Sequence, residues 1–449
     1  MDNTAQTKKT EELLKRVLFT LALLIIFRIV SQVPVPGIDG GAMKAFFDQN
    51  SGTALGMLNK FTGGALERFS VLALGVMPYI TSSIIFSLLT VSFPFFAAVQ
   101  KEPDGHKKIT QWSRYFTVVL CIFQGFGLAT LMEAQGGQAG GANVVINPGM
   151  QFKILAVLTM TAGTMFVMWL GEQITERGIG NGISLIIFAG IAAAIPAGIR
   201  DTISLWNSGE LKPMVLLLFL ASIPLIFWIV IYLERAIRKL PVQYAKRVVN
   251  NRVYGGQQAH LPVKLNISGV MPPIFASALM SAPVTFFSFV PDAWTGVKSI
   301  ADQFQAMLIP GELLYGVIFF FLNVFFAYFY AQIQFKTKDI SESLQKNGGY
   351  IPGIRPGEKT AEFLDSVVAK LTLFGGVYIG LICIVPFLMM SFLKIPGNVA
   401  MILGGTSLLI LVGVAIDTLG QIESFLISDR YNKMYKSRGK YNGARAKRF

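Results

Sequence analysis

The sequence predicts an all-α membrane protein whose transmembrane helices form two related halves. Three observations lead to this fold class. Of the 449 residues, 53% are hydrophobic and only 14% are charged, with a mean hydropathy of +0.55, whereas soluble domains carry about 25% charged residues. The apolar residues gather in runs long enough to cross a bilayer, and the basic residues concentrate on one side of these runs. This composition excludes a soluble domain and a disordered chain.

Ten apolar runs reach the roughly 20 residues that a membrane-spanning helix needs. They lie at residues 17–34, 69–92, 114–133, 152–171, 182–199, 214–233, 269–290, 313–332, 371–391 and 399–418. The first run lacks a small-residue cleavage site and leads directly into VPVPGIDG at 33–40. We therefore expect a retained span and not a signal peptide.

The Lys and Arg residues predict the orientation. With the N-terminus in the cytoplasm, 30 of the 39 lie in cytoplasmic segments, eight lie outside and Arg28 lies within the first span. This bias predicts that both termini are cytoplasmic. Attraction to anionic lipid headgroups explains the short basic loop at 93–114. The loops at 234–268 and 335–370 are long for a helical bundle and predict docking of a large acidic partner, including nucleic acid.

The sequence carries no catalytic or cofactor-binding motif. The P-loop, H-E-x-x-H and G-x-S-x-G patterns do not occur in it. Cys121 and Cys383 both lie in apolar runs, and His106 and His260 are too few and too far apart for a His-rich metal site. We therefore expect no enzyme activity, cofactor or metal, and we expect the energy source to be a partner or a gradient.

Two charged residues within the predicted spans are candidates for an ion pathway. Arg28 lies in the outer half of the first span, and Asp417 lies at the inner end of the tenth. Snorkelling or placement at a helix end is the alternative for both. A proton-coupled transporter would carry more such charged groups within its spans. We therefore keep a secondary transporter of a small solute only as the alternative to a nonselective pore.

One short motif occurs in each half of the chain. GVMP at 75–78, in the second span, matches GVMP at 269–272, in the seventh. These two spans run in opposite directions in the predicted topology, as in an inverted repeat with Gly/Pro-interrupted helices at the midplane. The chain then divides into an N-terminal half at 1–200, with spans 1–5, and a C-terminal half at 201–449, with spans 6–10 and the basic tail.

Three pairs of aliphatic side chains lie about one helical turn apart, so each pair shares a helix face. They are Val76 and Ile80, Ile183 and Ile187, and Met271 and Ile274. A ring of such side chains would form a hydrophobic constriction that excludes ions by dewetting and binds no particular substrate. Ordinary packing between helices gives the same periodicity, so both interpretations stay open.

The segment at 35–68 is too polar and too short to span. It is either an external amphipathic loop or a re-entrant helix that folds back into the outer mouth. A re-entrant helix would be a movable stopper for a nonselective pore, with Gly63 and Gly64 as its hinge. Glycine pairs are also common in plain loops.

Six strings, in this order along nearly the whole chain, resemble the SecY family, the channel subunits of the bacterial protein translocase. They are FRIVSQVPVPGID (27–39), FTGGALERFSVLALGVMPYITSSI (61–84), GTMFVMWLGEQITERGIGNGIS (163–184), YAKRVVNNRVY (244–254), GGYIPGIRPGEKT (348–360) and GGTSLLI (404–410).

This resemblance implies an hourglass pore between the two halves, with a plug at about 58–68. It implies a pore ring of six aliphatic residues, with Met271 as a neighbouring wall residue. The ring positions are Val76, Ile80, Ile183, Ile187, Ile274 and Ile410. A lateral gate would lie between the second and seventh spans, with the third and eighth beside it. The gate's polar cluster would be Thr90, Gln124 and Asn266.

The resemblance also implies function and partners. The protein would translocate unfolded polypeptides across the bacterial cytoplasmic (inner) membrane and release transmembrane segments sideways into lipid. The SecE subunit would clasp the channel, usually with SecG. The long cytoplasmic loops, with Arg247, Arg252 and the loop-tip Arg355, would dock the SecA motor ATPase and the ribosome with its nascent chain. Signal peptides, unfolded preproteins and membrane lipids are further expected partners. The double proline at 272–273, where the family often has one, is expected to shift the start of the seventh helix.

Overall fold

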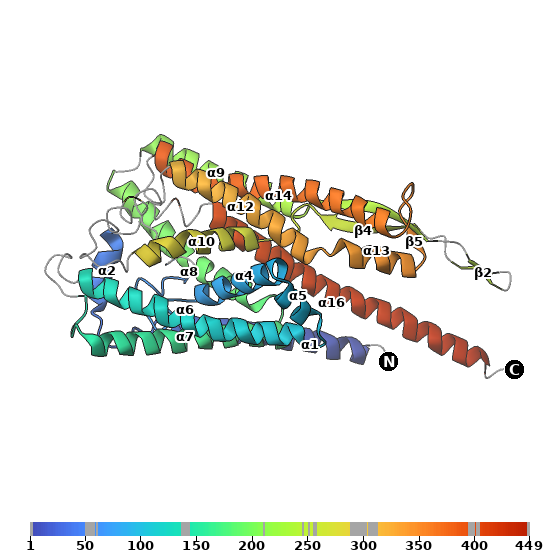
Figure 1. Ribbon diagram of the computed structural model, residues 1–449, viewed down its shortest axis with the longest axis horizontal. Coiled ribbons are helices and arrows are strands. Elements are labelled where there is room, and N and C mark those ends of the chain that lie inside the picture. The colour runs from blue at the N-terminus through green and yellow to red at the C-terminus, as the bar shows by residue number, and fades with distance from the viewer. Residues whose placement is uncertain are drawn as a thin grey trace.

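A computed structural model shows a bundle of long helices with both chain termini at the same end (Figure 1). The structure describes residues 3–49, 59, 62–135, 144–209, 212–244, 247–249, 252–254, 258–287, 303, 313–393, 400 and 405–446. The strands formed by residues 237–264 also lie at the end that carries the termini. The segments predicted to be cytoplasmic therefore gather at one end of the bundle.

Each of the ten predicted spans falls on a helix. In the first half these are α1 (Asn3–Val30), α4 (Met77–Ser92), α6 (Gly105–Gln135), α7 (Met150–Arg177) and α8 (Gly182–Asn207). In the second half they are α9 (Pro213–Glu234), α10 (Met271–Phe287), α12 (Leu313–Gln334), α14 (Glu358–Leu393) and α16 (Gly405–Ala446). Among the described residues, seven helices are long and apolar enough to cross a membrane. An eighth span forms if α4 is joined to α5 (Pro94–Lys101), across a bend of 99°. The all-α membrane class is confirmed.

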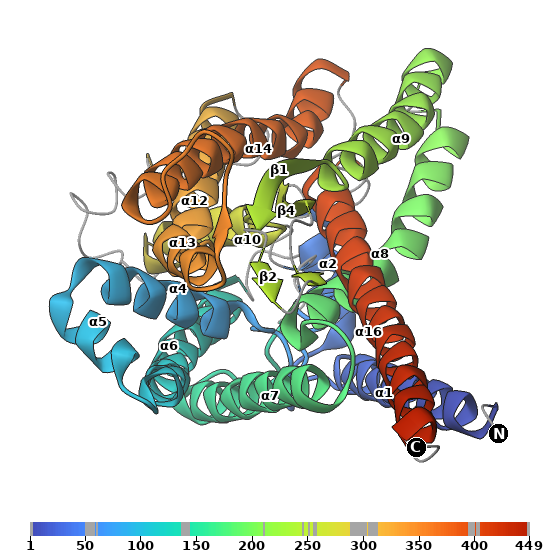
Figure 2. The same ribbon diagram turned by 90° about the vertical axis from the view of Figure 1, so that its right-hand side faces the viewer.

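The two halves of the chain face each other across the bundle. Viewed from the end with the termini, α4, α6, α7 and α1 lie along one side, and α12, α14 and α9 lie along the other (Figure 2). Helix α4 packs against both α6 and α10, and α12 packs against α10 and α14. The second and seventh predicted spans are therefore neighbours at the boundary between the halves.

Polar contacts fasten α4, α6 and α7 together. The Ser82 hydroxyl of α4 donates a 2.6 Å hydrogen bond to the carbonyl of Ser113 in α6. Arg114 of α6 forms a 2.8 Å ion pair with Glu172 of α7. Hydrogen bonds between membrane helices contribute about 0.6 kcal/mol each on average. Together with apolar packing they attach α4 to its own half.

The repeated GVMP motif has similar backbone geometry in both halves. Gly75 and Gly269 have φ angles of 55° and 60°, a region that glycine enters without steric cost. Helices α4 and α10 begin two residues later, at Met77 and Met271, and each has proline second, where no intrahelical N–H bond is lost. The predicted start of the second span at residue 69 is therefore wrong, because residues 69–76 form turns. The double proline does not shift α10, which starts at the position equivalent to the start of α4.

Three segments predicted as loops contain regular structure. The 93–114 loop holds α5 and the start of α6. In the 234–268 loop, β1 (Ile237–Tyr244) pairs antiparallel with β4 (Gln258–Lys264), and β2 (Arg247–Val249) pairs with β3 (Arg252–Tyr254). The 335–370 loop holds α13 (Thr337–Lys346), β5 (Gly349–Tyr350) and the start of α14. Leu240 and Val263 of the β1–β4 pair share an apolar cluster with Leu364 of α14, so these elements form one unit, referred to below as the cytoplasmic unit because its segments are predicted to be cytoplasmic.

The segment at 35–68 is more structured than a plain loop. It begins with α2 (Gly40–Gln49), and residues 62–69 form consecutive turns. Residues 58, 60 and 61 of the expected plug lie outside the described residues, as do 288–290, 399 and 401–404 of the predicted seventh and tenth spans.

Candidate functional site

Aliphatic residues from both halves meet in one buried apolar cluster, referred to below as the central cluster. Five predicted ring residues belong to it, each at most 5% exposed, and Ile183 packs against it. These five are Val76, Ile80, Ile187, Ile274 and Ile410. Five of the six thus belong to one apolar cluster, and the sixth packs against it; the cluster extends over most helices of the bundle.

The seam between α4 and α10 is apolar. Val76, Ile80 and Ile84 at α4 and Ile274 and Phe275 of α10 are all buried in the central cluster. Burial of apolar area is non-directional, so such a seam can separate and close again without breaking specific pairs. This is the arrangement that a gate between the second and seventh spans requires.

Residues 62–70 comprise the described stretch 62–68 of the expected plug at about 58–68 and the two residues that follow it. This stretch, named the plug segment below, forms turns closed by side-chain hydrogen bonds. The Asn59 side chain accepts the N–H of Glu67 at 2.8 Å and donates to its carboxylate at 3.2 Å. The Thr62 hydroxyl donates to the Asn59 carbonyl at 3.0 Å and accepts the N–H of Leu66 at 3.3 Å. These bonds satisfy backbone groups that lie outside any regular helix.

The plug segment is buried between two apolar clusters. Ala65 is fully buried in the central cluster, whereas Leu66 and Phe69 belong to a second cluster on the α2 side. Phe69 has a φ of 44°, which is unusual for a bulky residue and is held by complete burial. The Val35 N–H also donates to the Phe69 carbonyl at 2.9 Å. The segment therefore contributes Leu66 and Phe69 to the cluster on the α2 side and Ala65 to the central cluster.

Arg28 connects α1 to the plug segment. Its Nη1 donates a 2.9 Å hydrogen bond to the carbonyl of Gly63. Gly63 has a φ of 68°, and a Cβ there would lie 2.7 Å from the Cα of Gly190 in α8. Gly64 has a φ of 83° and open space around it. Of the two predicted hinge glycines, Gly63 is thus clamped between α1 and α8, and Arg28 bonds to the protein interior and does not snorkel.

The three residues expected to form the gate's polar cluster lie on three different elements. The Thr90 hydroxyl donates to the carbonyl of Ser87 in its own helix at 2.7 Å. Gln124 is half-buried on α6, and Asn266 is buried in the turn before α10. No hydrogen bond joins any two of these three residues in the part of the chain that the structure describes.

A buried carboxylate that sequence reasoning missed holds Asn266. Glu234, at the end of α9, is only 6% exposed, and Asn266 Nδ2 donates to its two oxygens at 3.0 and 3.3 Å. The same amide donates to the Gly269 carbonyl at 3.0 Å, and the Ser268 hydroxyl donates to Asn266 Oδ1 at 3.0 Å. The network therefore ties the turn that begins α10 to the end of α9. Its only sequence signal was an acidic residue at the edge of a very apolar span.

A cavity of about 800 Å³ borders this network. It is lined by residues of β4, α8, α9, α10 and α16, including Glu234 and Asn266. Lys264 and Asp417 line it and form a 3.0 Å ion pair. Asp417 is half exposed and paired, which does not favour an ion pathway, but α16 continues well past it, so it does not lie at a helix end.

The expected docking residues lie on the cytoplasmic elements. Arg355 is exposed in the turn between β5 and α14, and its carbonyl accepts the Thr360 hydroxyl at 2.9 Å. Arg247 and Arg252 lie in the β2–β3 hairpin.

The described residues contain no group of three or more His, Cys, Asp or Glu side chains that could hold a metal. Cys121 and Cys383 are buried free thiols. The residues gathered at the site can make apolar contacts and hydrogen bonds.

The fold and the site together define a helical membrane protein in which helices from both ends of the chain share a buried apolar cluster. The SecY family model matches residues 70–419. The protein translocase subunit SecY of Escherichia coli K12 is 44% identical over 428 residues, which cover 95% of this chain and 94% of that one. The corresponding subunit of Helicobacter pylori 26695 is 43% identical over 420 residues, covering 93% and 97%.

A solved structure of a related fold is described as a protein conducting channel. It has a TM-score of 0.64 at 16% identity and covers 92% of each chain. Sec61 in the canine ribosome–channel complex has a TM-score of 0.60 at 16% identity, again with 92% coverage of each chain. The chain described here belongs to the SecY family of protein translocase subunits.

We predict that Arg28→Met loosens the plug segment. A hydrogen bond to a charged group contributes about 1.5–3 kcal/mol, so amide hydrogen exchange in residues 62–70 is expected to become roughly 10- to 100-fold faster. Exchange in α7 should not change. Arg200→Met, which removes an exposed arginine from α8, is the control. Unchanged exchange in residues 62–70 of Arg28→Met would show that this bond does not hold the segment.

Proposed function

We propose that this protein is the pore subunit through which unfolded polypeptides cross the bacterial cytoplasmic membrane. Membership of the SecY family supports transport of polypeptides over the alternative of a small-solute transporter. The observation that carries the proposal is the burial of Ala65 of the plug segment in the same apolar cluster as the predicted ring residues. This shared cluster supports a closed constriction in which the plug segment is the stopper.

The ring would form a seal that accepts any sequence. Val76, Ile80 and Ile410 offer no hydrogen-bonding side chain, so they hold no particular substrate group, and they exclude ions when the pore is empty by dewetting. A polypeptide that enters from the cytoplasmic side displaces the plug segment, and the aliphatic side chains close around the polypeptide. Breaking the bond between Arg28 and Gly63 is part of the cost of that displacement.

Apolar segments would leave sideways between α4 and α10. Each Leu, Ile, Phe or Val gains roughly 0.3–0.6 kcal/mol in lipid. The apolar region of a signal peptide, about 7–15 residues long, therefore supplies several kcal/mol toward separating an apolar seam. In this proposal Asn266, which is held by Glu234, ties the start of α10 to the end of α9. Thr90 and Gln124 are polar groups that an apolar segment passes as it leaves.

The two halves, residues 1–200 and 201–449, would move relative to each other when the gate opens. The sequence bias of basic residues places the cytoplasmic unit and both termini inside the cell. There Arg247, Arg252 and Arg355 would dock the ribosome and the SecA motor. The likeness to Sec61 in a ribosome–channel complex supports the ribosome as a partner. SecE and SecG would complete the channel.

Crosslinking of a stalled nascent chain tests the proposal. A photo-reactive side chain placed at Ile80 or Ile274 should crosslink to a stalled secretory polypeptide. The same probe at Leu217 of α9, which is 63% exposed and faces outward, is the control and should crosslink to lipid. Equal crosslinking of the polypeptide at all three positions would contradict a path through the ring.

The apolar seal gives a second prediction. The triple variant Ile80→Ser, Ile187→Ser, Ile274→Ser should raise the ion conductance of resting membranes, because polar side chains keep the constriction wet. Leucine at the same three positions keeps it apolar and should leave the conductance low. Both proteins must be recovered in equal folded amounts, and equal conductance would count against the ring.

Docking of the motor gives a third prediction. Arg355→Glu reverses the charge at an exposed turn and should slow motor-driven export without reducing the amount of assembled channel. Lys359→Glu is the control, because Lys359 is also exposed and pairs with Glu362 at 2.8 Å. Normal export by Arg355→Glu would refute a role for this residue in docking.

A further inference from the structure

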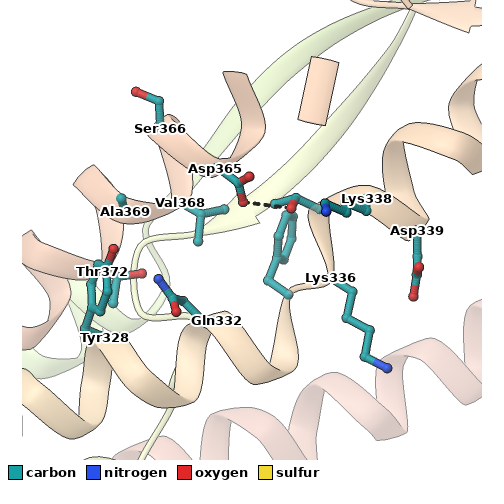
Figure 3. A pocket seen from close by; sticks show the side chains of 12 residues that line it. Tyr328, Gln332, Lys336, Lys338, Asp339, Asp365, Ser366, Val368, Ala369 and Thr372 are labelled. Carbon is teal, nitrogen blue, oxygen red and sulfur yellow. Dashed lines mark hydrogen bonds between the residues drawn. The ribbon is translucent and has the colours of Figure 1, made fainter. Parts of the chain in front are cut away.

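A cavity outside the proposed pore lies at the junction of α12, α13 and α14. Its volume is about 670 Å³ (Figure 3). One wall is the last turn of α12 and the linker to α13, and the other is α14 around residues 365–372. The predicted spans end at residue 332 and resume at 371, so the cavity lies where the cytoplasmic leaflet meets water.

The cavity offers both signs of charge. Lys336 and Lys338 come from the linker and the start of α13, and Asp339 and Asp365 are their acidic counterparts. Asp365 accepts the Thr337 hydroxyl at 2.7 Å. Within the described residues neither lysine forms an ion pair with either aspartate. A purely anionic ligand would meet the Asp365 carboxylate, whereas a ligand with both a phosphate and an ammonium group satisfies both signs.

A buried hydroxyl in the cavity has no partner. Thr372 is 3% exposed, and its Oγ1 has no hydrogen-bond partner. It lines the cavity and is drawn beside Tyr328 and Gln332 in Figure 3. Buried polar atoms are normally hydrogen-bonded, so Thr372 carries an unsatisfied hydroxyl in the wall of this cavity.

An apolar stripe leads from the cavity into the membrane. Phe321, Phe325, Tyr328 and Gln332 follow each other on α12 at intervals of three or four residues, so they share one helix face, and Phe335 comes directly after the helix. Phe321 and Phe325 are 65% and 56% exposed. Along this face, aromatic rings that can contact acyl chains come first, and polar groups that can bind a headgroup follow at the interface.

We propose that this cavity binds the headgroup of an aminophospholipid of the cytoplasmic leaflet, of the phosphatidylethanolamine type. The phosphate lies against Lys336 and Lys338, and the ammonium group donates hydrogen bonds to Asp365. An ester or phosphate oxygen accepts from the Thr372 hydroxyl. The acyl chains lie along Phe321 and Phe325. The site is separate from the pore and does not depend on polypeptide transport.

The test measures which lipids the purified full chain retains. The protein is placed in nanodiscs with equal amounts of phosphatidylethanolamine, phosphatidylglycerol and phosphatidylcholine, and the retained lipids are counted by native mass spectrometry. We expect retention of phosphatidylethanolamine about tenfold above phosphatidylcholine, since choline cannot donate a hydrogen bond to Asp365. Asp365→Asn, which still accepts the Thr337 hydroxyl, should abolish that preference. Glu362→Gln, on the same helix outside the cavity, should keep it.

A second variant separates binding from folding. Thr372→Val keeps the shape and removes the unpaired hydroxyl, so the melting temperature without added lipid should not fall. The rise in melting temperature on adding phosphatidylethanolamine should be smaller than in the unmodified protein. An equal rise in both proteins would overturn the role of Thr372.

Three results would overturn the proposal itself. The first is equal retention of the three lipids. The second is stronger retention of phosphatidylglycerol that depends only on Lys336 and Lys338, which would indicate an anionic lipid site. The third is a photo-crosslink from Gln332 to a polypeptide in native membranes, which would show that a protein partner fills the cavity. A crosslink to phosphatidylethanolamine supports the proposal.

Discussion

The structure depends on the apolar packing of the central cluster, to which helices from both ends of the chain contribute. A pore that admits any polypeptide cannot recognise a particular group, yet it must hold back ions when it is empty. Aliphatic contact meets both demands, because it is non-directional and keeps water out. The central cluster joins the start of α4 with α8, α10 and α16, and it includes Ala65 of the plug segment. In the proposed function, the backbone that interrupts the helices at Gly75 and Gly269 is tolerated because it faces protein.

Directional bonds hold the parts that surround this apolar centre. Arg28 holds the plug segment through the Gly63 carbonyl, Glu234 holds the turn before α10 through Asn266, and Ser82 holds α4 to α6. Each bond contributes only about 0.5–3 kcal/mol, and an incoming apolar segment can offset a contribution of that size. In the proposed function, the polar contacts therefore set how easily each part moves, and the apolar seam keeps the closed pore from leaking.

Sequence patterns predicted the spans well and the irregular parts poorly. Hydropathy located a helix for every span, because lipid requires all backbone groups to pair within the helix. It misplaced the start of α4, where turns at 69–76 are as apolar as the helix that follows. It missed the strands at 237–264, because the mixture of basic and apolar residues in this loop shows no clear two-residue alternation. The bonds of Arg28 and Glu234 were also missed, since they join residues 35 and 32 positions apart and leave no local signal.

Helix α14 has a mechanical consequence. It begins at Glu358, three residues after Arg355, and continues without a break for 36 residues to Leu393, a length of about 54 Å at 1.5 Å per residue. Pro386 lies inside the helix near its far end, and proline is a common cause of helix kinks, so a tilt applied near Arg355 is carried rigidly only through the segment before this residue. The contact with α12 would be the pivot of that segment. In the proposed function, a push on the docking loop would therefore reach the membrane interior as a change in helix angle.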